Sequence, residues 1–437
     1  MKPHLEYVLS APGSMGIFSN PVFSDHHAML KYRLHGAMHL LQTHIIGSCI
    51  HTSPMVSTLF NAYTEVGYAK KLVSLDNLFA PAMYADSGGL QIVTAGKPIT
   101  PEIKTKIYET QSIADFAMCF DEIPLETTTI VRTINERSNT KNKIFDQSRH
   151  VSSGTLTGKN IKEQVDAFRL LNAKTKVIMI IQGNCAEDMV NYYNAIASQL
   201  KPEDYEYIGG MAIADTCIGN GELESIEMLR GAKEITKVCH ANVARHLHIL
   251  GVGSVSRMRP ILYLIKSGYL NTFKRVSYDS SSHTSTFRFG LLKVNGTCRP
   301  LGLTRTKKAE AHFSNVYDFF DEMLDPVLTK GEFLDIILLD GVKEWNFANV
   351  KTNAKTYATD KMIIGYMGNA LHTYYQIANF VGCLDKVFEE ENDYTEIGRL
   401  LEVRTDDDMD HWHHHLSKHV RSKRITRKEN HGVLDFT

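Results

Sequence analysis

The chain has 437 residues, of which 43% are hydrophobic and 22% are charged, and its net charge is −1. This composition is typical of a globular protein and excludes a disordered, collagen-like or disulfide-stapled chain. Seven cysteines without a C-x-x-C pair indicate a reducing compartment. The first residues lack a signal peptide's apolar segment, and no apolar run approaches the ~18 residues of a membrane span. We therefore expect a cytoplasmic protein without a membrane partner.

Positive charge is unevenly distributed along the chain. Residues 235–308 contain 13 Lys or Arg and a single acid, Asp279, whereas the chain average of 49 acids in 437 residues would place about 8 there. One interpretation is a basic surface patch that acidic segments such as 406–410 offset. The other is a basic face for a phosphodiester polymer, with one carboxylate retained inside it for chemistry.

Short apolar runs recur along the chain, and each ends on a polar residue or a glycine before a helical pattern. The runs span residues 79–84, 116–120, 177–181, 207–208, 248–250 and 276–278. This alternation predicts βαβ units and a parallel sheet. An open doubly wound sheet would also fit, but no G-x-G-x-x-G or Walker sequence marks a nucleotide site. We therefore expect an α/β protein with a (β/α)8 TIM-type barrel over residues 1–302.

The pattern becomes helical after the barrel, so residues 303–437 are expected to form a helical C-terminal region with a basic tail. Amphipathic helices are predicted over residues 316–328, 331–345, 360–380 and 395–403. The tail over 418–428 is basic and free of acids. It is either a solvated tail or an arm that contacts nucleic acid. A homodimer is compatible with this organisation.

Ligand sites in such folds lie at the carboxyl ends of the strands. The predicted strand ends supply the carboxylates of Asp86, Asp121 and Asp279, the amide of Gln182, and several glycines. Two carboxylates in different environments suit displacement at an anomeric carbon, because one attacks while the other moves a proton. Asp and Gln side chains also match the donor and acceptor edge of a purine-like base. A single acid at a strand end is, however, often only a helix N-cap.

A series of ordered motifs makes the prediction more specific. The motifs are D-S-G-G-L-Q at 86–91, T-P-E at 100–102 with Gln111, F-D-E at 120–122, I-Q-G at 181–183, G-G-M-A at 209–212, L-G-V-G at 250–253 and D-S at 279–280. Over residues 80–285 this order resembles the tRNA-guanine transglycosylase superfamily. The resemblance implies a TIM-type barrel that exchanges guanine in a nucleic acid for a 7-deazaguanine, with no cofactor and no ATP.

The resemblance also implies roles for individual residues. Asp279 matches the nucleophile that attacks C1′ and releases guanine, and Asp86 matches the general acid and base. The positions that match the base-binding site are Ser87, Leu90, Asp121, Gln182, the backbone of Gly210, and Leu250. Leu90 and Leu250 lie where the family usually has an aromatic residue and a methionine, so the slot stays apolar but stacks less strongly.

Departures from the family pattern concern the substrate. The tRNA enzymes follow the nucleophile with a C-x-C-x-x-C and a histidine that bind structural zinc, whereas this region offers only Cys298 and His312. A zinc site of that kind is therefore not expected. A histidine run, with i,i+4 pairs, could bind a metal or lie exposed to solvent. It consists of His411, His413, His414, His415 and His419.

A barrel without the zinc ligands and with a divergent C-terminal region is similar to the DpdA-type DNA 7-deazaguanine transglycosylases of phages and bacteria. This resemblance implies DNA and 7-cyano-7-deazaguanine (preQ0), or a derivative, as substrates, and the host cytoplasm if the source is viral. Three alternatives stay open: a zinc-less enzyme that modifies tRNA, a non-catalytic transglycosylase subunit, and a barrel glycoside hydrolase.

The basic segment leads to a separate prediction about the polymer. We expect its cations to lie on the rim around Asp279 and to neutralise phosphates, so that affinity falls steeply with salt. The residues predicted to bind nucleic acid are Arg257, Arg259, Lys274, Arg275 and Arg288.

Overall fold

A computed structural model describes the fold in segments. These are residues 4–9, 50–57, 82, 84–88, 100–124, 147–183, 185–214, 222–253, 258, 261–262, 264–265, 268–280, 291–294, 297–300, 307–321, 329–339, 372 and 375–376.

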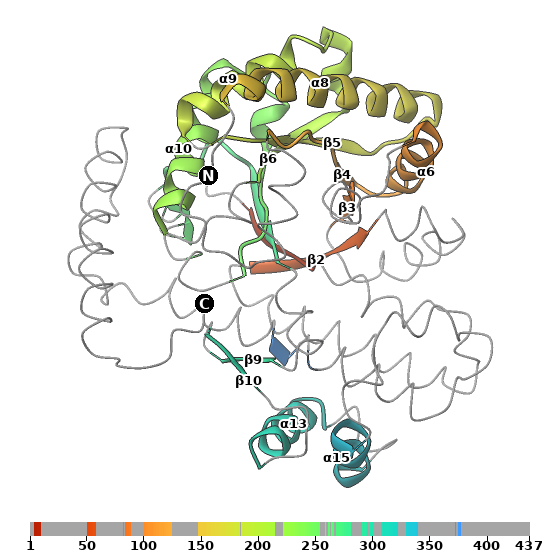
Figure 1. The fold of residues 1–437 in the computed structure, drawn as a ribbon, viewed down its shortest axis with the longest axis vertical. Coiled ribbons are helices and arrows are strands. Elements are labelled where there is room, and N and C mark those ends of the chain that lie inside the picture. Colours follow the sequence, from red (N-terminus) through yellow and green to blue (C-terminus); the bar gives the residue numbers. More distant parts are fainter. Residues whose placement is uncertain are drawn as a thin grey trace.

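Eight parallel strands in these segments form a curled sheet (Figure 1). They are β1 (His4–Leu9), β2 (Ile50–Ser57), β3 (Tyr84–Asp86), β4 (Phe116–Met118), β5 (Lys176–Ile181), β6 (Ile208–Ile213), β7 (His246–Ile249) and β8 (Arg275–Asp279). Each strand pairs with the next, and β1 also pairs with β8 from His4↔Arg275 to Val8↔Asp279, so the ring of strands closes. The carboxyl ends of all eight strands therefore lie on one rim.

Helices connect the strands where the connections are described. They are α6 (Pro101–Gln111), α8 (Gln147–Leu170), α9 (Ala186–Ala197), α10 (Glu222–Val238) and the short 3-10 helices η2 (Pro202–Tyr207) and η4 (Val243–Arg245). Figure 1 shows α8, α9 and α10 packed along the outside of the strands. The predicted α/β class with a parallel sheet is thus confirmed. The connections from β1 to β2 and from β2 to β3 lie outside the described residues, so a helix after every strand is not part of this finding.

Continuous burial explains why the central strands form here. Five of the six residues of β5 and all six of β6 are buried. A parallel strand that is covered on both faces has an uninterrupted apolar run in its sequence. The V-I-M-I-I that follows Lys176 is such a run. The sheet core is therefore encoded by hydrophobicity that does not alternate.

Strand β6 differs from the prediction in its position. The sequence pattern ends a strand at Ile208 and treats Gly209 and Gly210 as its end, but the structure begins β6 at Ile208 and continues it to Ile213. Tyr207, predicted as strand, closes η2 instead. Both glycines lie inside the strand, where an added Cβ at Gly210 would meet the backbone of His246 in β7 and one at Gly209 would meet the side chain of Lys176 in β5.

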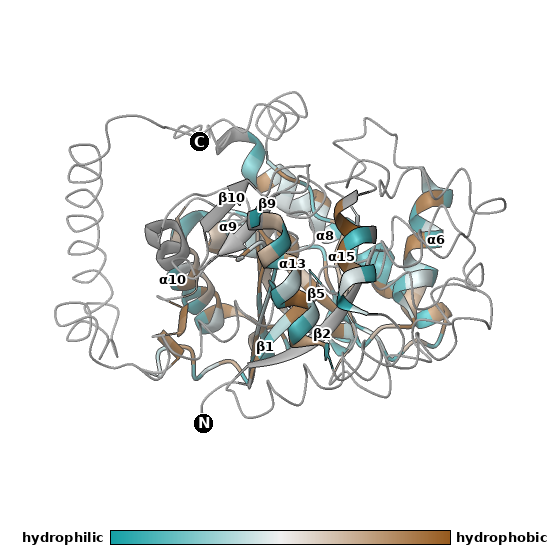
Figure 2. Ribbon diagram, turned by 90° about the horizontal axis from the view of Figure 1, so that it is seen from below, coloured by the Kyte–Doolittle hydropathy of each residue, from teal (hydrophilic) through white to brown (hydrophobic). Residues whose placement is uncertain are grey.

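Two further strands, β9 (Leu291–Val294) and β10 (Thr297–Pro300), form an antiparallel pair that the sequence pattern did not predict. After them come α13 (Lys307–Phe319) and α15 (Lys330–Leu339), which overlap the predicted segments 316–328 and 331–345. Both helices carry apolar and polar residues (Figure 2) and meet through Tyr317 and Phe333, whose ring centroids are 5.6 Å apart. A helical region after the barrel strands is therefore present in the described residues.

The rest of the C-terminal predictions cannot be compared with the structure. The helix over 395–403, the basic tail and the histidine run over 411–419 lie outside the described residues, as does all but three residues of the segment 360–380. Among the helices that are described, none has the length and apolar character to cross a bilayer.

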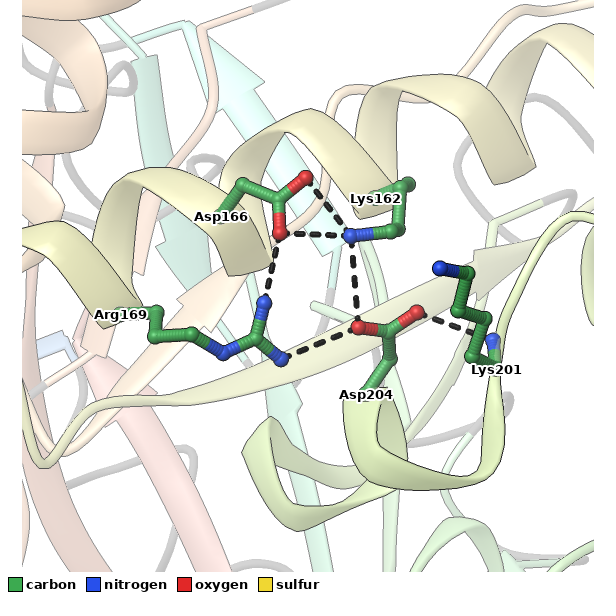
Figure 3. A network of polar contacts seen from close by, with 5 residues as sticks. All are labelled: Lys162, Asp166, Arg169, Lys201 and Asp204. Carbon is green, nitrogen blue, oxygen red and sulfur yellow. Dashed lines mark hydrogen bonds and ion pairs between the residues drawn. The ribbon is translucent and has the colours of Figure 1, made fainter.

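An ion-pair network connects η2 to α8 (Figure 3). The buried carboxylate of Asp204 accepts the backbone N–H of Lys201 at 2.9 Å and an Arg169 N–H at 3.1 Å, and Lys162 Nζ lies 3.5 Å away. Asp166 joins Lys162 and Arg169 on the helix surface. Burial alone would raise the pKa of Asp204, but the Lys201 N–H and the two cations together hold it below its usual value.

We expect Asp204→Ala to lower the free energy of unfolding by about 2–3 kcal/mol, because it removes a buried acceptor and the cap of η2. The matched control is Asp166→Ala, which removes a half-exposed partner of the same cations and should cost about 0–1 kcal/mol. Urea unfolding at neutral pH measures both. Because the pKa of folded Asp204 is lowered, its contribution is present above about pH 4 and disappears as the pH falls below that value. Equal losses for the two variants would refute this view of the network.

Candidate active site

Four predicted site residues gather at the carboxyl rim of the sheet. Asp86 and Asp279 are the last residues of β3 and β8, Gln182 directly follows β5, and Asp121 lies three residues beyond β4. β3, β4 and β5 follow one another in the chain and β8 comes much later, but the parallel direction of the strands puts all four ends on the same side. The structure therefore brings together the residues that the sequence pattern placed at separate strand ends.

Asp121 and Gln182 form a hydrogen-bonded pair. Gln182 Nε2 donates to Asp121 Oδ2 at 2.6 Å, and the Gln182 carbonyl lies 3.1 Å from His150 Nε2. Burial of the carboxyl raises the pKa of Asp121 to about 6, although the hydrogen bond from Gln182 lowers it. The negative charge of Asp86 raises it further, which indicates that the two carboxyl groups lie near each other.

The loop that carries Asp121 is fixed by its backbone. Thr157 Oγ1 accepts the N–H of Glu122 at 2.8 Å, and Tyr192 OH donates to the Glu122 carbonyl at 2.7 Å. Thr157 and Tyr192 come from α8 and α9 and lie 2.6 Å apart at their hydroxyls. The side chain of Glu122 itself is exposed. Two helices therefore hold this loop, in which Asp121 pairs with Gln182 while Glu122 is exposed.

Asp279 is held by one of its two carboxylate oxygens. The backbone N–H of Gly251 donates to Asp279 Oδ1 at 2.9 Å, and His248 Nε2 lies 3.5 Å from the same oxygen. Gly251 has a φ of 74°, a conformation that other residues adopt only with strain, and this turn after β7 directs its N–H at the carboxylate. Both contacts are made to Oδ1 rather than to Oδ2.

A polar chain lies behind Asp279, inside the ring of strands. Ser277 Oγ lies 2.6 Å from His246 Nε2 and 2.7 Å from His248 Nδ1. All three side chains are buried. The sequence reasoning overlooked these residues and the bond from Gly251. A usable signal was the spacing H-x-H on β7 and R-x-S-x-D on β8, because every second residue of a strand points to the same face.

A second polar cluster closes the opposite, amino-terminal end of the sheet. Glu6 is fully buried and accepts hydrogen bonds from Tyr84 OH at 2.7 Å and from Arg275 at 2.9 Å. Burial and the charge of Glu6 raise the pKa of Tyr84 well above its usual value, so its hydroxyl keeps its proton. This cluster neutralises charge inside the ring of strands and lies away from the rim.

The prediction that Lys274 and Arg275 lie on the rim around Asp279 is wrong. Arg275 begins β8 and Lys274 precedes it, whereas Asp279 ends the strand. Four residues of a strand span roughly 13 Å, so these cations lie at the other end of the sheet. Arg275 points inward to Glu6, and Lys274 is exposed. Counting charges along the sequence ignored the direction of the strand. Arg257, Arg259 and Arg288 lie outside the described residues.

Of the other predicted base-binding positions, two directly follow strands, one lies within a strand and one lies outside the described residues. Ser87 is buried directly after Asp86, and Leu250 follows β7 with its N–H bonded to the Ile213 carbonyl at 3.1 Å. Gly210 instead pairs with Ile178 in the middle of β6, where an added Cβ would collide with the carbonyl of His246. The predicted role of its backbone in base binding is therefore not supported, and the glycine serves the approach of β7. Leu90 lies outside the described residues.

No group of three or more His, Cys, Asp or Glu residues suited to a metal ion occurs within the described segments. His312, considered above beside Cys298, lies 3.0 Å from His372 Nδ1 through its Nε2. Burial lowers the pKa of His312 to about 4, so His312 is neutral at pH 7.

Comparison with protein-family models finds no match to this chain, and comparison with curated proteins finds none. The resemblance of the ordered motifs therefore rests on the motif residues themselves. What the site can do chemically follows from its geometry.

Proposed function

We propose that the protein is a transglycosylase that exchanges guanine in DNA for a 7-deazaguanine base, in a site at the mouth of a (β/α)8 barrel. The observation that carries the proposal is the arrangement of Asp279. Its carboxylate is held through Oδ1, which leaves Oδ2 for a ligand, and it lies on the same rim as Asp86 and the Asp121–Gln182 pair. A nucleophile, a proton carrier and a base-reading pair are what this reaction needs.

The base-reading pair suits the Watson–Crick edge of guanine. An ionised Asp121 accepts N–H groups, and guanine presents two of them at N1 and N2. The amide of Gln182 still has a second N–H after its bond to Asp121, and O6 of guanine is an acceptor. Adenine presents the opposite pattern at these positions, so the pair favours guanine and its 7-deaza analogues.

The reaction proceeds in two displacements. Asp279 Oδ2 attacks C1′, and guanine departs with the electron pair of the C1′–N9 bond and a proton from the Asp86 carboxyl. The product is an ester between Asp279 and the nucleoside. The incoming 7-deazaguanine then gives its N9 proton to the Asp86 carboxylate and attacks C1′, which releases Asp279. Two inversions give net retention, and no other reactant is consumed.

DNA is proposed as the polymer because of the motif resemblance and the missing zinc ligands. With Arg275 and Lys274 away from the rim, the described cations add no support for either polymer. Reaching C1′ of a stacked nucleotide also requires the base to leave the duplex, at a cost of a few kcal/mol. Single-stranded or mismatched DNA should therefore react faster than paired DNA.

The experiment that tests the function supplies 7-cyano-7-deazaguanine together with duplex DNA, single-stranded DNA or tRNA. Each polymer is then digested and its nucleosides are analysed by mass spectrometry. The proposal predicts the modified deoxynucleoside. A modified ribonucleoside alone would overturn DNA as the substrate, and no modified nucleoside from any polymer would overturn the transglycosylase.

Base use should depend on pH through Asp121. Below about pH 6 its carboxyl takes up a proton and turns a donor toward the N–H groups of the base, so kcat/KM for the free base should fall about tenfold per pH unit. Asp121→Asn should cost about 1–3 kcal/mol in base use and remove this dependence, while DNA binding by gel shift is unchanged. Gln182→Leu removes a hydrogen bond that lowers the pKa, so the inflection should move to higher pH. An inflection that persists in Asp121→Asn would assign it to another group.

A further inference from the structure

The buried side chain of His248 lies between the polar chain inside the sheet and the carboxylate of Asp279. Its Nδ1 is 2.7 Å from Ser277 Oγ, and its Nε2 is 3.5 Å from Asp279 Oδ1. The imidazole is fully buried, and no described side chain makes a hydrogen bond to Nε2. The contact that the structure gives Nε2 is therefore the one to the carboxylate of Asp279.

We propose that His248 is a positioning residue for Asp279, and that Ser277 and His246 fix its Nε2–H tautomer. This inference rests on the proposed function only in giving Asp279 the role of nucleophile. The protonation pattern itself follows from counting donors and acceptors in the described residues.

Asp279 Oδ1 accepts the N–H of Gly251, so this oxygen acts as a hydrogen-bond acceptor. A lone pair on His248 Nε2 would repel that oxygen, so Nε2 carries the proton and Nδ1 is an acceptor. The one proton of Ser277 then points to His248 Nδ1. Ser277 Oγ consequently accepts from His246 Nε2, which fixes the His246 tautomer as well.

The neighbouring groups are consistent with this direction. The ring of Tyr84 lies 5.9 Å from that of His248, but its hydroxyl donates to Glu6, so the phenol proton is not available to His246. Burial and the charge of Asp279 raise the pKa of Tyr7, which stays protonated and donates to the Ser280 carbonyl at 3.3 Å. Arg275 is engaged with Glu6. None of these groups competes for the proton between Ser277 and His248.

The consequence concerns the orientation of the nucleophile. With Gly251 and His248 both facing Oδ1, rotation of the carboxylate would break both contacts, so Oδ2 is the oxygen left to attack. In the ester intermediate Oδ1 is the carbonyl oxygen, and the same two donors hold it while the second base attacks. His248 thus acts through Asp279 and does not touch the substrate.

Two amide variants separate this role from a general effect on packing. The terminal nitrogen of Gln reaches the position of Nε2, whereas that of the shorter Asn reaches the position of Nδ1. We expect His248→Asn to lower kcat about 10- to 100-fold at unchanged KM for DNA, and His248→Gln to stay within a few fold of the wild type. Equal activity of the two variants would overturn the proposal.

The decisive experiment does not depend on activity. In protein labelled with 15N at its histidines, long-range 15N–1H spectra of the free enzyme report which ring nitrogen is protonated, and the signals lost in His248→Gln assign the residue. The proposal predicts the Nε2–H tautomer for His248 and its loss or mixing in Ser277→Ala. An Nδ1–H tautomer in the wild type, or no change in Ser277→Ala, would overturn it. An inactive enzyme with the Nε2–H tautomer would overturn the proposed function alone.

Discussion

Asp279→Asn should reduce base exchange by about 10³-fold or more, because an amide oxygen is a poor nucleophile toward C1′. The fold should persist, since the amide keeps the shape of the carboxylate and can still accept the N–H of Gly251. The measurement is the yield of modified deoxynucleoside over time. DNA affinity should be unchanged or slightly higher, because a negative charge is lost at the rim.

Asp86→Asn serves as the matched control for this experiment. It also removes a rim carboxylate, but it should block proton transfer to the leaving base rather than the attack itself. Exchange at the wild-type rate in Asp279→Asn would assign the nucleophile to another residue. Asp86 would then be the next candidate.

Arg275→Met should lower the free energy of unfolding by about 3–5 kcal/mol, because it leaves the carboxylate of Glu6 buried without its cation. The prediction separates a structural arginine from the nucleic-acid contact that the sequence suggested. The urea midpoint should fall, while the salt dependence of DNA binding stays as in the wild type.

Two variants control this second prediction. Lys274→Met removes the neighbouring, exposed cation and should change stability by less than about 0.5 kcal/mol. Glu6→Gln combined with Arg275→Met removes both charges and should recover much of the loss. A loss for Arg275→Met no larger than for Lys274→Met, together with a flatter salt dependence, would contradict the assignment of Arg275 to the interior.

The sequence predicted those parts of the fold that depend on local hydrophobicity. The run at 177–181 corresponds to β5, and the polar residues at the carboxyl ends of β3, β5 and β8 lie on one rim as expected. Strand β1 was overlooked because H-L-E-Y-V-L contains a glutamate, which is buried here only because Arg275, distant in the sequence, pairs with it. Such a pairing has no local signature.

The sequence predicted the carboxylates and the amide of the site, but not the hydrogen bonds that hold them. The bond between Gln182 and Asp121 joins residues that follow two different strands, and the N–H of Gly251 reaches Asp279 only because its φ is positive. The prediction that the basic residues of β8 lie beside Asp279 is wrong for a related reason. A count along the sequence does not distinguish the two ends of β8, so Arg275 and Asp279 were assigned to one surface.

Detection of the covalent intermediate tests the proposed mechanism most directly. Wild-type protein is incubated with single-stranded DNA without an incoming base, denatured, digested and analysed by peptide mass spectrometry. The proposed mechanism predicts an adduct on the peptide that contains Asp279. The adduct should be absent in Asp279→Asn and should be released when 7-cyano-7-deazaguanine is added before denaturation. An adduct on another residue, or exchange without any adduct on Asp279, would contradict the mechanism.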